Sequence, residues 1–271
     1  MMAGDTAAHD GGGDGARTPP RQPSGGIGQN AAYHQMDQMS QMNQMLSAIS
    51  HEIKNPLASL KLNAQMATRA IERGRMPRPE SAALLTQAVN QLERIANELS
   101  DAVRADSGHL ALTLKPVNMT ALVQRAATEA TDAYQRPIMT DLPDGQLLAQ
   151  ADESRVRQAL GYLLANAVNY TPPQGDITLA ARRVNGRIRV DVRDRGPGIT
   201  ARDLPYLFEP FYRGEAPALS HVHEGAGLGL GLYIAQRIIE RQGGAMGVEP
   251  PPDQGDQGAI LWFTLPQAAC S

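Results

Sequence analysis

A repeating spacing of apolar residues between positions 39 and 71 constrains the fold more than any other feature of the sequence. Apolar side chains recur there mostly at alternating steps of three and four residues. They are Met39, Met42, Leu46, Ile49, Ile53, Leu57, Leu60, Ala64, Ala67 and Ile71. Such spacing is typical of the apolar seam of a coiled coil or a helix bundle. It predicts one long helix, kinked where Pro56 removes a backbone hydrogen bond.

A second helix is predicted after a break at residues 74–77. Its apolar stripe comprises Leu85, Ala88, Leu92, Ile95, Leu99 and Ala102. Two helices joined by a short connection form an antiparallel hairpin. Because a single hairpin leaves an apolar face open to water, we expect two chains to pair as a homodimer with a four-helix bundle.

The chain beyond the hairpin has a different pattern, in which strands and helices mix without regular alternation. Predicted strands lie at 110–117, 177–184, 187–194, 245–250 and 259–266, and predicted helices lie at 119–134, 154–170 and 231–242. The pair Asn185-Gly186 between two strands is the strongest short hairpin signal. The pattern predicts an α/β sandwich, a mixed sheet with helices on one face. The whole chain is therefore expected to be α+β.

Three segments are expected along the chain. Residues 1–34 are rich in glycine and poor in large apolar side chains, so they cannot bury enough surface to offset the entropy of ordering. We predict a disordered tail there, the helical hairpin at 35–107 and the α/β domain at 108–268.

Composition excludes several classes of protein. The 25 basic and 28 acidic residues give a net charge of −3, which argues against a nucleic-acid partner. No apolar run approaches the roughly 18 residues of a membrane span, and the N-terminus does not resemble a signal peptide. The single cysteine, Cys270, excludes an internal disulfide and a cysteine-based zinc site. We expect a cytoplasmic protein with no membrane span in this chain.

His51 is the first candidate for chemistry. If Leu46 begins a heptad, His51 falls at the outermost position of the helix, where its imidazole can react. The neighbouring carboxylate of Glu52 can accept the other ring proton. The alternative is an ordinary exposed histidine.

Three further motifs suggest a nucleotide site. Asn166 offers an amide oxygen of the kind that Mg²⁺ accepts. Asp194 directly follows a strand, and its carboxylate can accept from an amino group such as that of adenine, while Gly196 and Gly198 permit close approach of a ligand. The glycine run at 225–231 precedes a helix, where free backbone amides attract phosphate. Taken alone, each motif could equally be a surface hydrogen bond or a tight turn.

In this order and at these spacings, the motifs resemble those of the sensor histidine kinases of two-component signalling. The similar segments are HEIKNPL at 51–57, LLANAVNYTP at 163–172, DRGPGI at 194–199, FEPFYR at 208–213 and GAGLGLGL at 225–232. The resemblance implies a dimerisation and phosphotransfer hairpin followed by an ATP-binding kinase domain. It implies an enzyme that uses ATP and Mg²⁺ to phosphorylate its own histidine and then an aspartate of a separate response regulator.

The resemblance also implies roles for individual residues. His51 matches the phosphorylated histidine, Glu52 the acidic residue that assists transfer, and Asn55 the polar residue that positions water when the regulator is dephosphorylated. Asn166 matches the Mg²⁺ ligand and Asp194 the adenine-binding aspartate. The remaining matches to nucleotide-contacting positions are Gly196, Gly198, Gly227, Gly229, Tyr170 and Arg213.

Two departures from the family pattern leave alternatives open. Tyr162 stands where the family often has asparagine, and Asn169 stands where it often has lysine or arginine. A catalytically weak dimeric signalling scaffold, or an ATPase or serine kinase of the same fold, therefore remain rival interpretations. The pair His221 and His223 could in principle hold a metal, but we expect exposed lid residues. No sensor domain is recognisable in the chain, so we expect either input from an upstream sensor partner or another chain, or a truncated kinase core.

Overall fold

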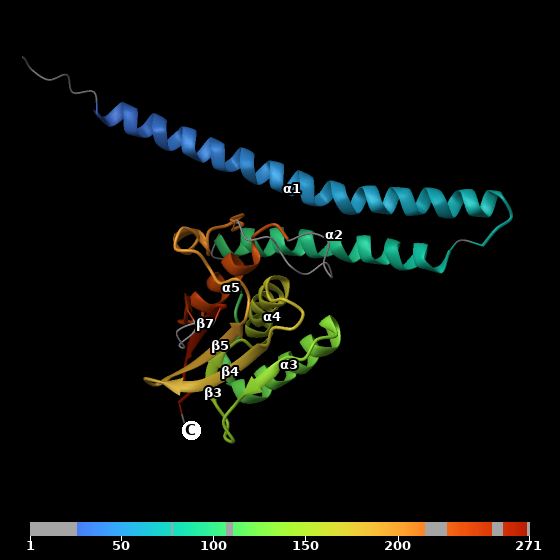
Figure 1. Ribbon diagram of the computed structural model, residues 1–271. Helices are drawn as coiled ribbons and strands as arrows, with labels where there is room; N and C mark the ends of the chain where they lie inside the picture. Colours follow the sequence, from blue (N-terminus) through green and yellow to red (C-terminus); the bar gives the residue numbers. More distant parts are fainter. Residues whose placement is uncertain (1–25, 77, 107–110, 215–226, 251–256, 270–271) are drawn as a thin grey trace, which may run out of the picture. The chain divides into compact units, whose positions relative to one another are not determined.

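The computed structural model describes residues 26–76, 78–106, 111–214, 227–250 and 257–269, with side chains from Leu46 onward. It divides into two units, residues 1–44 and 45–271. Helix α1 (Gly26–Glu72) extends from the first unit into the second, and α2 (Pro79–Asp106) follows it (Figure 1). Helix α1 thus begins within the stretch predicted as a tail, whose earlier part lies outside the described residues.

The end of α1 is set by backbone hydrogen bonds. Gly74 adopts a φ of 68°, in the left-handed region that glycine favours. The N–H groups of Gly74 and Arg75 then donate to the carbonyls of Ile71 and Ala70, at 2.9 and 2.8 Å. This termination confirms the predicted break at 74–77. The helix continues on both sides of Pro56, whose side chain is buried.

The main sheet of the second unit has five strands in the order β2-β4-β5-β7-β6. Strand β2 (Met139–Asp141) runs parallel to β4 (Ile177–Val184), whereas β5 (Arg187–Asp194), β7 (Ile260–Pro266) and β6 (Ala245–Glu249) pair antiparallel. Asn185 and Gly186 have φ values of 49° and 72°, as the predicted two-residue hairpin turn requires. The predicted mixed sheet is confirmed.

Two short strands were not predicted from the sequence. Strand β3 (Leu148–Ala151) pairs antiparallel with β1 (Lys115–Asn118) in a second, two-stranded sheet, and β2 joins the edge of the main sheet. The predicted strand at 110–117 is correspondingly shorter, because ladder hydrogen bonds begin only at Lys115.

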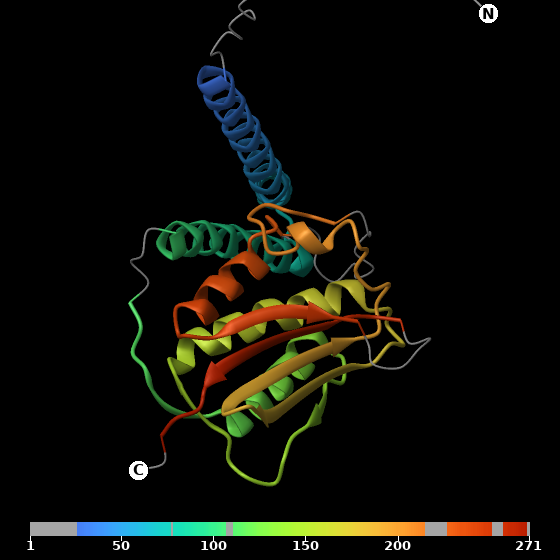
Figure 2. The same ribbon diagram turned by 90° about the vertical axis from the view of Figure 1, so that its left-hand side faces the viewer.

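Three helices cover one face of the sheet: α3 (Met119–Tyr134), α4 (Glu153–Tyr170) and α5 (Gly231–Glu240) (Figure 2). The predicted apolar stripe of α4 is buried in full, and it comprises Val156, Ala159, Leu160, Leu163, Leu164, Ala167 and Val168. Strand side chains alternate beneath it, as in Ile188, Val190 and Val192, which are all fully buried. Asp152 caps α4 by accepting hydrogen bonds from the N–H groups of Ser154 and Arg155.

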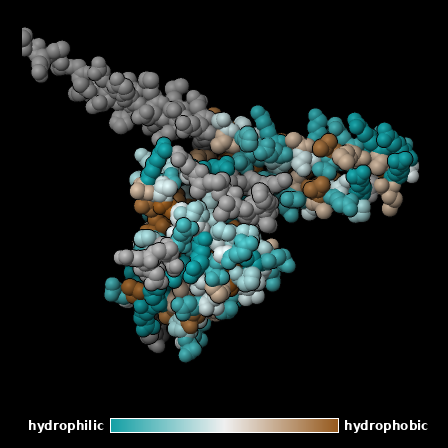
Figure 3. Space-filling model, viewed as in Figure 1, coloured by the Kyte–Doolittle hydropathy of each residue, from teal (hydrophilic) through white to brown (hydrophobic). Residues whose placement is uncertain are grey.

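The two hairpin helices leave apolar side chains on their surface, interspersed with polar ones (Figure 3). Leu57, Leu62 and Ile71 of α1 are 46%, 58% and 64% exposed. Leu84 and Val89 of α2 are each 43% exposed. Burying such side chains against a partner is favourable, which is the physical basis of the predicted bundle. None of the helices in the described parts of the chain has the length and apolar composition of a membrane span.

Candidate active site

A cavity of about 180 Å³ lies where α4, the loops after β5 and the start of α5 meet. It brings together most of the nucleotide-site residues that were predicted from separate motifs. Those that line it are Asn166, Tyr170, Asp194, Gly198, Arg213, Gly227 and Gly229. Gly196 does not line the cavity, but its N–H donates a hydrogen bond to Asp194, which does.

Asp194 is the last residue of β5 and only 6% exposed. The N–H of Gly196 donates to its Oδ1 at 2.8 Å. A Cβ at Gly196 would lie 2.8 Å from the Tyr170 carbonyl oxygen, so this turn requires glycine. Burial raises the pKa of Asp194, against the opposing effect of backbone N–H donors from Gly196 and Ala259. A buried carboxylate of this kind is suited to accept a hydrogen bond from the amino group of a base.

Asn166 reaches the cavity because α4 buries its apolar stripe in the core. Its half-buried amide shares the pocket lining with Asn169 and Tyr170. Among the described residues, no group of three or more histidine, cysteine, aspartate or glutamate side chains could hold a metal ion. Mg²⁺ keeps several waters and binds readily with few protein ligands when a substrate phosphate supplies the others. The single amide oxygen of Asn166 fits that mode of binding.

The glycines before α5 form the other end of the cavity. Gly229 has a φ of 72°, and a Cβ there would lie 2.6 Å from the carbonyl oxygen of Tyr212. Phe211 is itself in the left-handed region, with a φ of 65°, and its N–H donates to the Gly229 carbonyl at 3.1 Å. The FEPFYR segment therefore holds the backbone at Gly229 in place. The start of α5, where backbone N–H groups have no partner within the helix and the helix dipole is positive, is suited to bind phosphate.

Asp203 is a pocket residue that sequence reasoning missed. It is 6% exposed, and its carboxylate accepts hydrogen bonds from the hydroxyls of Tyr212 and Thr200, at 2.7 and 2.8 Å. The bond from Tyr212 joins the loop after β5 to the FEPFYR segment. No local motif marks Asp203, because its role depends on a residue that lies further along the chain.

His51 lies on the exposed side of α1, as its heptad position predicts, and Asn55 is exposed one turn later. Glu52 differs from both, since it is only 5% exposed. Its Oε1 lies 3.4 Å from Nη1 of Arg213, a residue that lines the cavity. The structure therefore shows Glu52 in contact with the α/β domain.

Two side chains of α2 also line the cavity, and the sequence did not indicate them. They are Arg94 and Glu98, of which Glu98 is only 7% exposed. The hairpin and the α/β domain were predicted as separate segments, so no pattern within either one could place these residues at the pocket.

Both departures from the family pattern are found at the cavity. Tyr162 is half-buried, and burial raises the pKa of its hydroxyl to about 12. Its ring packs against Gly231, where an added Cβ would lie 3.0 Å from Cδ1. Asn169 lies in the lining as well. His221 and His223 lie outside the described residues.

Comparison with known families adds to this geometry. Residues 41–108 match the His Kinase A (phospho-acceptor) domain. Residues 151–269 match the histidine kinase-, DNA gyrase B- and HSP90-like ATPase family. The order of the two matches is that of the predicted hairpin and sandwich. The chain belongs to the sensor histidine kinases.

Individual relatives support the same assignment. Sensor histidine kinase YkoH of Bacillus subtilis is 30% identical over 213 residues, which are 78% of this chain and 45% of the relative. The kinase/phosphatase MprB of Mycolicibacterium smegmatis is 30% identical over 229 residues, with coverage of 82% and 45%. This histidine kinase chain thus spans about half the length of the curated relatives it matches.

Solved structures share the fold. Full-length ShkA in complex with AMPPNP matches with a TM-score of 0.58 and 26% identity, covering 84% of this chain and 46% of that one. Histidine kinase AdeS of Acinetobacter baumannii also has a TM-score of 0.58, at 21% identity, covering 81% and 98% of the two chains. The predicted fold class is confirmed.

Proposed function

We propose that this chain is an ATP-dependent protein histidine kinase that phosphorylates His51 and passes the phosphoryl group to an aspartate of a separate response regulator. The observation that carries the proposal is the convergence of Asn166, Asp194 and Gly229 on one cavity, in a chain that also exposes His51 on the matched phosphoacceptor segment. ATP, held with Mg²⁺, supplies the phosphoryl group when bound.

The kinase domain contributes recognition and positioning. Asp194 accepts a hydrogen bond from the adenine amino group, and Gly196 holds that carboxylate in place. Asn166 binds Mg²⁺, while backbone groups at Gly227 and Gly229 face the phosphates. Tyr170, Gly198 and Arg213 complete the nucleotide contacts. Catalysis of phosphoryl transfer depends mainly on such positioning and on charge neutralisation.

The hairpin contributes the nucleophile. The lone pair on Nε2 of neutral His51 would attack the γ-phosphorus of ATP, the bond from that phosphorus to the β,γ-bridging oxygen would break, and ADP would leave with the bonding electron pair. The ring proton stays on Nδ1 during this transfer, where the Glu52 carboxylate would stabilise the positive charge that develops on the ring. Glu52 contacts Arg213 in the structure. Release of that contact is therefore a step that precedes transfer. It frees Glu52 for His51 and Arg213 for the nucleotide.

The same surface serves the partner protein. Asn55 lies four residues after His51 on an exposed side of α1. Its amide can donate and accept hydrogen bonds, so it is suited to hold a water in line with the aspartyl phosphate of the regulator. We infer that the chain also dephosphorylates its regulator, acts as a homodimer in the cytoplasm and receives its signal from an upstream sensor partner.

A second candidate function is a dimeric signalling scaffold with weak ATP turnover. Tyr162 and Asn169, which both line the cavity, favour it. Tyr162 lacks the amide that the family often has at its position, and Asn169 lacks the cation that the family often has at its own. Incubation with γ-labelled ATP and Mg²⁺ separates the two. A kinase incorporates label that is acid-labile and alkali-stable, as phosphohistidine is. A scaffold binds ATP without incorporating label.

A further inference from the structure

Helix α2 presents a carboxylate to the phosphate end of the nucleotide pocket. The two carboxylate oxygens of Glu98 lie 3.7 and 4.0 Å from the position that a Cβ would occupy at Gly227. Gly227 is one of the glycines assigned to the phosphates. Glu98 is only 7% exposed, so water screens its charge poorly.

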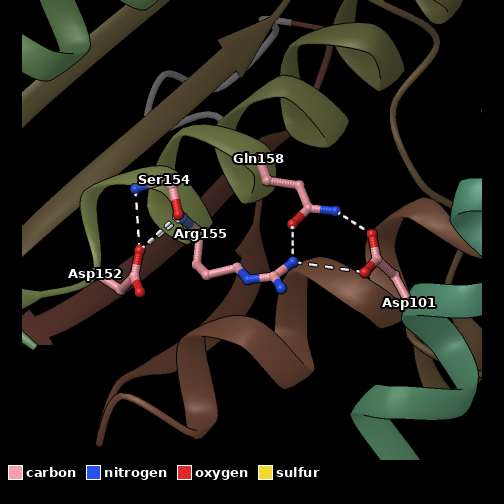
Figure 4. Close-up of polar contacts among 5 residues, drawn as sticks. All are labelled: Asp101, Asp152, Ser154, Arg155 and Gln158. Atoms are coloured by element: carbon pink, nitrogen blue, oxygen red, sulfur yellow. Dashed lines mark hydrogen bonds and ion pairs between the residues drawn. The ribbon is translucent and has the colours of Figure 1, made fainter. Parts of the chain in front are cut away.

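Several contacts hold α2 at this place. Ile95 is 3% exposed and belongs to the core of the kinase domain, and Leu99 packs against that core. The carboxylate of Asp101 accepts a hydrogen bond from Gln158 at 2.5 Å and pairs with Arg155 at 3.5 Å, so that it ties α2 to α4 (Figure 4). Near the end of α2, Arg241 donates to the Ala105 carbonyl at 2.7 Å.

The charges around Glu98 do not neutralise it fully. Arg94, one turn earlier on α2, is its favourable neighbour, whereas Glu52 on α1 repels it. Burial is the largest effect and raises the pKa of Glu98. Glu52 meanwhile forms an ion pair with Arg213, a cation that is proposed to contact the nucleotide. Two hairpin carboxylates thus lie beside groups that would otherwise meet phosphates, one close to Gly227 and one paired with Arg213.

We infer that Glu98 makes docking of α2 and binding of the nucleotide phosphates mutually antagonistic. While α2 is docked, the carboxylate of Glu98 repels a triphosphate but leaves the adenosine end of the pocket available. Binding of ATP then favours release of the hairpin, which is the movement that frees Glu52 and His51 for transfer. This inference rests on the proposed function only in taking the cavity as an ATP site.

The test compares ATP·Mg²⁺ with adenosine by calorimetry on the full chain, wild type against Glu98→Gln. We expect the variant to bind ATP about tenfold more tightly, because the amide cannot carry the negative charge that the carboxylate places a few ångströms from the phosphates. Adenosine should bind both proteins equally. Glu93→Gln is the matched control, since it removes the same charge from an exposed position of α2.

A second variant separates charge from steric blocking. Asp101→Ala removes the contacts of α2 with Gln158 and Arg155 of α4, so it should raise the affinity for ATP when Glu98 is present. In the Glu98→Gln background the same change should raise the affinity for ATP little further. If Glu98→Gln leaves ATP affinity unchanged or weakens it relative to adenosine, the inference is wrong. If instead neither ligand binds the wild type, the cavity is not a nucleotide site, and the proposed function and this inference are both wrong.

Discussion

The guanidinium of Arg213 lies 3.4 Å from the carboxylate of Glu52, the residue that directly follows His51. Arg213 lines the proposed nucleotide cavity, and Glu52 belongs to α1, which carries the proposed phosphoacceptor. The contact therefore couples the group that would assist transfer to the site that would supply the phosphoryl group. Because Arg213 is half exposed, its net contribution to stability is small, and the contact can be exchanged for others.

Asp194→Asn should weaken the binding of ATP at least tenfold. The substitution keeps an acceptor for the Gly196 N–H but replaces a buried carboxylate with a neutral amide, which presents fewer acceptor positions to adenine. Titration of both proteins with ATP measures the change. Asp141→Asn, at an exposed position of β2, is the control. Equal affinities of the Asp194 variant and the wild type would show that Asp194 does not recognise the base.

The stability of Asp194→Asn relative to the wild type should increase as the pH rises from acidic to neutral. The folded state raises the pKa of Asp194 above its ordinary value of 3.8, mainly through burial. The protonated form is therefore the one that folding favours, and this stabilisation is lost as pH rises through the raised pKa. Asparagine stays neutral throughout. The melting temperature of Asp194→Asn minus that of the wild type should consequently increase between pH 4 and pH 7, and a constant difference would contradict the assigned cause.

Asn166→Ala should reduce the gain in ATP affinity that Mg²⁺ provides. The amide oxygen of Asn166 is the proposed protein ligand of the ion, so its removal leaves adenosine binding intact. Titrations with ATP in Mg²⁺ and in a chelator measure the gain for each protein. An unchanged gain in the variant would rule out Asn166 as the metal ligand.

Leu57→Glu should dissociate the dimer. Leu57 is 46% exposed in one chain, and a charge there would be costly to bury against a partner helix. Sedimentation should give a dimer for the wild type at micromolar concentration and a monomer for the variant. Leu204→Glu is the matched control, because Leu204 is 44% exposed but lies in the kinase domain. A monomeric wild type would contradict the four-helix bundle.

Asn55→Ala should slow the loss of phosphate from the regulator and leave phosphorylation of His51 within a few-fold of the wild type. The reason is that Asn55 is proposed to hold water and is not among the residues that line the cavity. Time courses with a phosphorylated regulator measure the first rate, and labelling by ATP measures the second. A parallel fall in both rates would mean that Asn55 is needed only to shape α1 beside Pro56.

Much of the fold could be predicted because its elements carry strong periodic patterns. The stripe of α4 and the alternation of β4 and β5 identify their buried faces directly, and Asn185-Gly186 sets the register between the two strands. Strands β2 and β3 have three and four residues. No period is visible over so short a length, and tertiary pairing alone determines them.

The site could be predicted only within each motif. Asp194 and the glycines before α5 stand out because their chemistry is local to a turn or to a helix start. The places of Glu52, Arg94 and Glu98 depend on how α1 and α2 meet the kinase domain. A heptad pattern describes one helix and its seam, so it cannot indicate that a charged side chain will be buried against another domain.

Labelling by γ-labelled ATP tests the central claim most directly, with wild type, His51→Gln and Lys54→Gln compared under the same conditions. Lys54 is an exposed neighbour on α1 and serves as the control. The account predicts acid-labile, alkali-stable label on the wild type and on Lys54→Gln, and none on His51→Gln. Label on His51→Gln at the wild-type rate, or no label on the wild type, would contradict it.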